Sequence, residues 1–94
     1  MYTIYKYQLE VRREIHVQMP VWARPLSVQI QNGKLTLWAV VDPNSTLADH
    51  VFYLIGTGQE MTGRERTFIS TVQAGEFVWH IFDSEEEWDY RREE

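Results

Sequence analysis

The stretch Leu26–Pro43 constrains the fold more than any other part of the chain, because it reads as two strands joined by a two-residue turn. Apolar and polar residues alternate on both sides of Asn32-Gly33, and a period of two is the signature of a half-buried strand. A type I′ turn needs positive φ at both central residues, which Asn and Gly tolerate best. The sequence therefore predicts a β-hairpin here, ended by Asp42-Pro43 because proline cannot donate to a ladder.

Similar alternation recurs along the rest of the chain between turn signals, and no helical period separates the strands. We expect seven short strands at Thr3–Val11, Ile15–Met19, Leu26–Gln31, Leu35–Val41, Val51–Ile55, Thr67–Val72 and Phe77–Phe82. This pattern favours an all-β, mainly antiparallel fold, either a small sandwich or a partly open barrel.

The pattern also predicts finer details of this fold. We expect the first two strands to pair with each other. Val51–Ile55 is apolar on both faces and should be a central strand or a strand covered on both sides, and Phe77–Phe82 is also apolar on both faces. Asn44–Asp49 reads as a loop, and Trp22 should pack under the connector Val21–Pro25.

Composition sets the broad class. The chain has 94 residues, which suits one domain, and it has no cysteine, which excludes disulfides, thiol catalysis and thiolate metal sites. It begins without the basic and apolar regions of a signal peptide, and no apolar run approaches the roughly 18 residues that a membrane span needs. We therefore expect a cytoplasmic protein without a membrane partner.

The net charge of −5 sits at the end of the chain. From Asp83 onward there are seven acidic residues and two arginines, and −7 + 2 gives −5. We therefore divide the chain into a β domain over residues 1–83 and an acidic tail over residues 84–94. Ser84 and Glu87 have the spacing of a capping box, which predicts a short C-terminal helix. An acidic balance argues against direct nucleic-acid binding, which needs clustered Lys and Arg.

No motif in the sequence indicates catalysis or a cofactor. His16, His50 and His80 lie on three different segments, without the spacing of metal ligands. The glycines of Gly56–Gly63 match no phosphate-binding pattern, and no serine has a GxSxG context. We predict a chain that is not an enzyme and has no catalytic residue, metal or cofactor.

Exposed aromatics and the tail are the candidate binding features. Aromatic residues make up 14% of the chain, and Trp38 is predicted on the outer sheet face, opposite Leu35 and Leu37. The acidic tail is either a solvated terminus or a lure for a basic surface, and its short helix needs a docking surface in the chain or on a partner. The predicted partner-binding residues are Trp38, Glu85, Glu86, Glu87, Trp88 and Tyr90.

A combination of segments resembles a known family. They are IYKYQLEV at Ile4–Val11, the pair Met19-Pro20, LSVQIQNGKLTLWAVVDP at Leu26–Pro43, Gly56-Thr57-Gly58, and Val78-Trp79-His80 with Phe82. Together they resemble small bacteriophage and prophage proteins described only as a domain of unknown function. The resemblance covers residues 2–82, and the tail beyond Asp83 looks like an addition. It implies a phage-type accessory protein in the bacterial host cytoplasm, and it transfers no catalytic or binding residue.

These observations lead to one functional hypothesis and two alternatives. The hypothesis is a non-enzymatic accessory protein that binds another protein, for example as an inhibitor of a host defence or metabolic protein. The first alternative is a self-assembling structural protein, because strands with two apolar faces need cover that a homodimer supplies. The second is carbohydrate binding through exposed aromatics such as Trp38 or Trp22.

Overall fold

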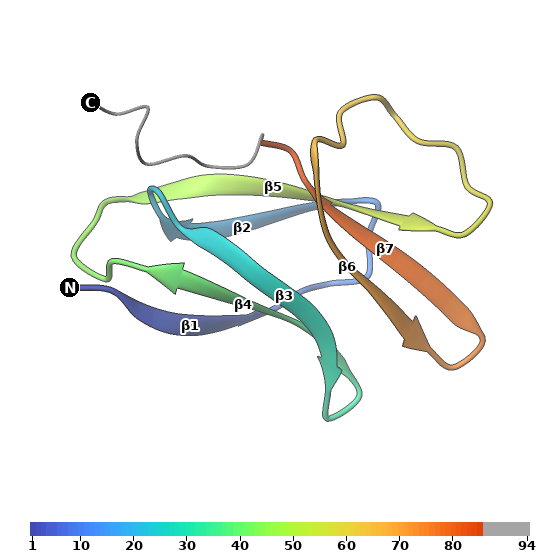
Figure 1. The fold of residues 1–94 in the computed structure, drawn as a ribbon, viewed down its shortest axis with the longest axis horizontal. Coiled ribbons are helices and arrows are strands. Elements are labelled where there is room, and N and C mark those ends of the chain that lie inside the picture. The colour runs from blue at the N-terminus through green and yellow to red at the C-terminus, as the bar shows by residue number, and fades with distance from the viewer. Residues whose placement is uncertain (86–94) are drawn as a thin grey trace.

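A computed structural model describes residues 1–85 and has seven strands. They are β1 (Thr3–Gln8), β2 (Glu14–Pro20), β3 (Arg24–Gln31), β4 (Lys34–Val41), β5 (Leu47–Gly56), β6 (Thr67–Ala74) and β7 (Phe77–Asp83). All pair antiparallel, in one sheet of order β1-β4-β3 and another of order β2-β5-β7-β6 (Figure 1). The all-β sandwich prediction is confirmed. Within residues 1–85 no helix could cross a membrane.

The predicted central hairpin is present as β3 and β4. Asn32 and Gly33 have φ values of 52° and 76°, which are the two positive values of a type I′ turn. The β6–β7 hairpin turns differently. Ala74 pairs with Phe77, and of the two turn residues between them only Gly75 has positive φ, at 63°. This fits a type II′ turn, which needs glycine at its first central position.

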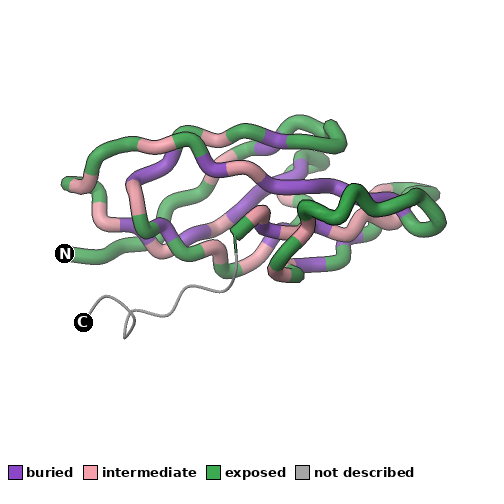
Figure 2. The backbone as a smooth tube through the Cα atoms, turned by 90° about the horizontal axis from the view of Figure 1, so that it is seen from above, coloured by how far each residue is buried: buried purple, intermediate pink, exposed green. Residues whose placement is uncertain are grey.

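The core lies between the two sheets. Its largest fully buried side chains are Phe52, Met19, Leu37, Leu54, Ile81, Val28 and Val41. Buried stretches run through the strands, whereas the N-terminal segment and the loops are exposed (Figure 2). As predicted from its two apolar faces, β5 is an interior strand of the four-stranded sheet, and β7, which is also apolar on both faces, is the other interior strand.

The expectation that the first two strands pair with each other is wrong. β1 pairs with β4, and β2 pairs with β5 in the other sheet. The connection between them runs from one sheet to the other: Leu9 is buried and donates its amide to Leu35, whereas the Arg13 carbonyl accepts from Leu54. A buried leucine at the start of this connection leads the chain into the second sheet instead of back along the first.

Two local expectations are also corrected. β5 begins at Leu47, so the predicted loop Asn44–Asp49 is shorter, because pairing with β2 overrides the weak strand propensity of this segment. Trp22 does not pack under its connector. Its side chain is 56% exposed, and its φ of 66° places it in a turn in which Ala23 donates to the Pro20 carbonyl.

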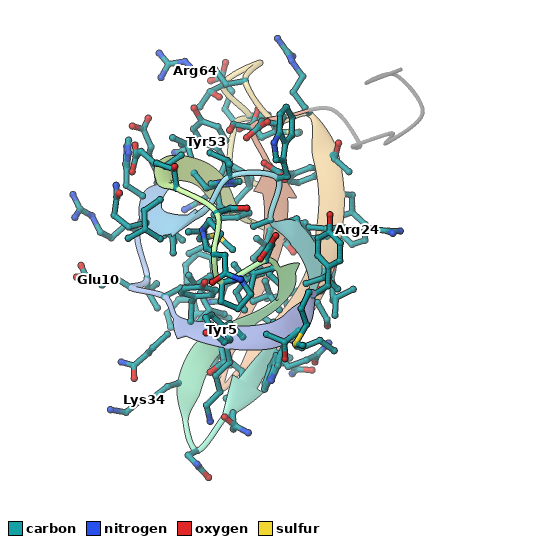
Figure 3. The ribbon with its side chains drawn as sticks, turned by 90° about the vertical axis from the view of Figure 1, so that its left-hand side faces the viewer. Tyr5, Glu10, Arg24, Lys34, Tyr53 and Arg64 are labelled. Carbon is teal, nitrogen blue, oxygen red and sulfur yellow. The ribbon has the colours of Figure 1, made fainter. Side chains whose placement is uncertain are left out.

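One side of the sandwich is joined and the other is open. At the joined side β3 lies beside β6, and the Val28 amide donates to the Ser70 hydroxyl at 2.9 Å. At the open side the edges of β1 and β2 are not paired with each other. Arg24 at the start of β3 and Glu10 in the β1–β2 connection lie on opposite sides of the molecule (Figure 3).

Candidate interaction surface

The open side contains a cleft of about 470 Å³ between β1 and β2. The apolar side chains of Tyr7, Leu9, Ile15 and Val17 line it, together with polar side chains of the same two strands. Burial, and to a lesser extent the nearby Tyr5 hydroxyl, raises the pKa of Tyr7 above its ordinary value. The cleft therefore has a mixed apolar and polar lining between two sheet edges.

Within residues 1–85, the outer edge of β1 carries unpaired backbone groups. Leu9 donates to Leu35, and in an antiparallel ladder hydrogen-bonded positions alternate. Odd residues of β1 therefore bond to β4, whereas Ile4, Lys6 and Gln8 turn their amides and carbonyls away from it. Such a row of free donors and acceptors is a template for another strand.

Apolar side chains are concentrated at this edge. Four of the twelve exposed large hydrophobic residues in the described part of the chain lie within its first five residues. These are Met1, Tyr2, Ile4 and Tyr5, with exposed fractions of 93%, 65%, 56% and 44%. Ile4 and Tyr5 are consecutive strand residues and point to opposite faces of the sheet, so exposed apolar side chains flank the free edge on both faces. Such an edge is typical of a protein interaction site.

The usual protection of an edge strand is missing from β1. Proteins guard edges with proline, bulges or outward lysines. β1 contains neither proline nor a bulge, and the Lys6 ammonium donates to the Gln31 side chain of β3 at 2.8 Å. That bond passes over the outer face of β4, where Thr36 is buried, so the charge of Lys6 is directed over the sheet and not off its edge.

The β2 edge is charged instead. His16 contacts the Asp49 carboxylate through Nδ1 and the Glu14 carboxylate through Nε2, both at 2.7 Å. Arg64 extends the network, with Nη1 at 3.4 Å from Glu14 Oε1. Hydrogen bonds to Asp49 and then to Glu14 raise the pKa of His16. Both ring nitrogens donate in the imidazolium form, so neither is available as a base or a metal ligand.

The other two histidines are placed separately. His80 bonds the Thr71 hydroxyl through Nδ1 at 2.9 Å and the Thr57 hydroxyl through Nε2 at 2.8 Å. His50 is buried, and within residues 1–85 its Nδ1 has no hydrogen-bond partner, with the Glu85 carboxylate 3.8 Å away. In the same part of the chain no group of three or more His, Asp or Glu side chains could hold a metal ion.

In the glycine-containing loop between β5 and β6, the Glu65 carboxylate binds the loop's own backbone amides. Glu65 accepts hydrogen bonds from the amides of Thr62 and Gly63 and from the Thr62 hydroxyl. Burial raises the pKa of Glu65, but these hydrogen bonds outweigh it and hold the pKa below its ordinary value. The amides that a phosphate would use are therefore already occupied.

The sequence-predicted partner-binding residues are not brought together within the described part. Trp38 lies on the outer face of the three-stranded sheet, opposite Lys6 and Ser27, and is half-buried. Glu85 follows β7 of the other sheet and is exposed. Glu86, Glu87, Trp88 and Tyr90, and with them nearly all of the predicted C-terminal helix, lie outside the described residues. Ser84 and Glu85 form a bend.

A second exposed aromatic surface lies on the β6–β7 hairpin. Phe77 stacks on Trp79 with ring centroids 5.6 Å apart, and Phe68 meets Phe82 edge-on at the same distance. Phe77 is 62% exposed and Phe68 is 55% exposed. Sequence reasoning gave weight to tryptophans and so missed these phenylalanines and the β1 edge. The alternation of apolar and polar residues predicts which face of a strand each side chain occupies, but it does not predict which strands lie at the edge of a sheet.

Comparison with known proteins places the chain in a family. The sequence model described as "Domain of unknown function (DUF7352)" matches residues 1–91. The chain belongs to the DUF7352 family. The match includes both sheets and continues to Arg91, so the DUF7352 domain takes in part of the acidic tail. No curated protein and no solved structure is significantly similar to this DUF7352 chain.

Proposed function

We propose that this chain is a non-enzymatic protein-binding domain whose docking site is the β1 edge with the adjoining cleft. One observation carries the proposal: β1 combines free backbone groups with the exposed patch formed by Met1, Tyr2, Ile4 and Tyr5. A partner strand would gain main-chain hydrogen bonds from the edge and bury apolar area against the patch. Binding is favoured over catalysis because the described histidines are held by carboxylates or hydroxyls, or are buried.

The resemblance to phage and prophage proteins supplies the proposed setting. In that setting the domain is an accessory protein in the bacterial host cytoplasm, and it inhibits a host defence or metabolic protein by occupying its surface. The acidic residues from Glu85 onward would add attraction to a basic partner, since charge mainly speeds encounter.

The test is a tagged pull-down from bacterial lysate with matched variants. Ile4→Lys places a charge in the patch at the β1 edge. Leu47→Lys is the control, because Leu47 is 61% exposed but lies at the start of β5. We expect Ile4→Lys to abolish capture of the wild-type partner and Leu47→Lys to retain it. Equal capture by all three proteins contradicts the β1 site.

Carbohydrate binding is a second candidate, favoured by the stacked pair Phe77 and Trp79. Exposed aromatic faces suit the apolar faces of sugars. The measurement is a titration of tryptophan fluorescence with a glycan panel. A saturable shift that Phe77→Ala removes would support this function, and a flat titration would weigh against it.

A further inference from the structure

We propose that the occupant of the β1 edge is a second copy of this chain. The two β1 strands pair antiparallel about a two-fold axis at Tyr5, so that the two three-stranded sheets join into one sheet of six strands. A two-fold interface uses the same patch on both subunits, which an antiparallel strand pair satisfies. The inference rests on the proposed function, because it takes the β1 edge as the docking site and names a second copy, in place of a bacterial protein, as the partner there.

The other edges of the two sheets are less suited to such pairing. β3 contains Pro25 and a register shift, and it lies against β6, whose own register shifts between Phe68 and Ser70. β2 ends in Pro20 and carries the charged network around His16. Among the edge strands of the described residues, β1 alone is straight in register, free of proline and flanked by exposed apolar side chains without a charged network.

The register follows from the backbone and the charges. Only even residues of β1 have free amides, so the axis passes through a residue of the strand, and axes at Tyr5 or Lys6 pair the most residues. An axis at Lys6 sets the two lysine side chains directly opposite, so that neither ammonium could leave Gln31 without meeting a like charge. An axis at Ile4 pairs only Thr3–Tyr5 of the strand. An axis at Tyr5 pairs Thr3–Tyr7 and sets each Lys6 against Ile4 of the second copy, so the lysines stay apart.

The area available fits a weak but specific dimer. Tyr2 and Tyr5 are 65% and 44% exposed, which leaves on the order of 200 Å² of ring surface to bury per copy. Met1 and Ile4 about double that, so two copies have roughly 1,000 Å² of exposed side-chain surface at this edge, and they reach the lower limit of specific interfaces only by burying nearly all of it. We therefore expect a dimer that dissociates on dilution into the micromolar range.

Single-cysteine variants test the register directly, because the chain has no cysteine of its own. Tyr5→Cys puts two thiols opposite each other on the axis, at a non-hydrogen-bonded pair with Cα atoms about 4.5 Å apart. Thr3→Cys is the matched control on the same face, with its two copies about 14 Å apart along the strands. With oxidised glutathione at micromolar protein, we expect a disulfide-linked dimer from Tyr5→Cys and monomer from Thr3→Cys.

A charge pair tests the partner independently of any cross-link. Ile4→Lys sets a lysine against Lys6 of the second copy twice per dimer, whereas Ile4→Glu sets a carboxylate there. We expect the dissociation constant from analytical ultracentrifugation to rise about tenfold for Ile4→Lys relative to Ile4→Glu. Equal constants for the two variants, equal cross-linking of both cysteine variants, or a monomeric wild type up to about 1 mM overturns the inference.

The same variants separate this inference from the proposed function. If the wild type is monomeric and Ile4→Lys still abolishes capture of a bacterial protein, the second-copy inference fails and the β1 docking site stands. If the wild type is monomeric and capture does not depend on Ile4, both fail.

Discussion

The Val28 amide donates a buried hydrogen bond to the Ser70 hydroxyl at 2.9 Å, and this bond joins the two sheets. Both strands shift register beside it, β3 between Pro25 and Ser27 and β6 between Phe68 and Ser70. A bulge re-aims the side chains around it. The two irregularities therefore let a side chain of one sheet reach the backbone of the other, and the joined side leaves β1 and β2 as the free edges.

Removing the Ser70 hydroxyl should destabilise the domain clearly. Ser70→Ala leaves the buried Val28 amide without an acceptor, which costs about 1–3 kcal/mol of the free energy of unfolding. Urea denaturation measures the change. Ser27→Ala is the control at the same junction, because the Ser27 hydroxyl accepts from the exposed Gln29 side chain and shares only a long hydrogen bond of 3.4 Å with the Ser70 hydroxyl, without contacting a buried amide. Equal losses for the two variants would contradict this role of Ser70.

The local elements of this fold could be predicted from the sequence, whereas the pairing of the strands could not. The turn at Asn32-Gly33 and the two-faced apolar strands β5 and β7 are properties of short windows, and both were predicted. The pairing of β1 with β4 is not a property of a short window and was not predicted, because Thr3 and Val41 meet only after two intervening strands have been placed. The strand start at Leu47 likewise depends on its partner Pro20.

The candidate site, like the fold, could be predicted from the sequence only in part. Alternation put Trp38 on the outer face, where it lies, but its partial burial depends on its neighbours across the sheet. The β1 patch was missed because exposure of Ile4 and Tyr5 follows from being at an edge, which is a property of the whole topology. Free edges can be found only after the strand order is known.

His16 should make stability depend on pH in a defined direction. Its pKa is raised in the folded state by hydrogen bonds to Asp49 and Glu14, so its stabilising contribution is complete below the ordinary value. That contribution is lost as pH rises through the folded-state pKa. We expect His16→Gln to lower the urea midpoint more at pH 5.5 than at pH 9.

The carboxylate partners provide the control for this pH effect. In a background with Glu14→Gln and Asp49→Asn, the imidazolium has no charged partner left in the network. His16→Gln should then change the midpoint equally at both pH values. A pH-dependent loss that persists in this background would assign the effect to another group.

Gly56 should resist even a methyl group. A Cβ at this position would lie 3.2 Å from Trp79 Cζ3 and 3.2 Å from the Gln59 side chain, closer than ordinary van der Waals contact. Because the Trp79 ring lies against the β5 backbone here, Gly56→Ala should cost about 1–3 kcal/mol in chemical denaturation. In a Trp79→Ala background the same substitution should cost clearly less. An equal cost in both backgrounds would show that the ring is not the obstacle.

Asp83 should change stability with pH in the same direction as His16, but burial and not a partner charge raises its pKa. Burial raises the pKa of this carboxyl, and it outweighs the hydrogen bond from the Glu85 amide, which favours the ionised form. A raised carboxyl pKa means that the folded state holds its proton more tightly, so stability falls as pH rises through the folded-state pKa. Asp83→Asn keeps an acceptor for the Glu85 amide and removes the buried charge.

The variant Asp83→Asn should therefore gain stability relative to the wild type as the pH rises. We expect the two urea midpoints to be close at pH 3, where both side chains are neutral, and the variant to be more stable at pH 7. Asp42→Asn is the control, because the Asp42 carboxylate also accepts a backbone amide, that of Asn44, but in an exposed turn. If Asp83→Asn were instead less stable at pH 7, the ionised carboxylate would be stabilising the end of β7, and burial would not dominate its titration.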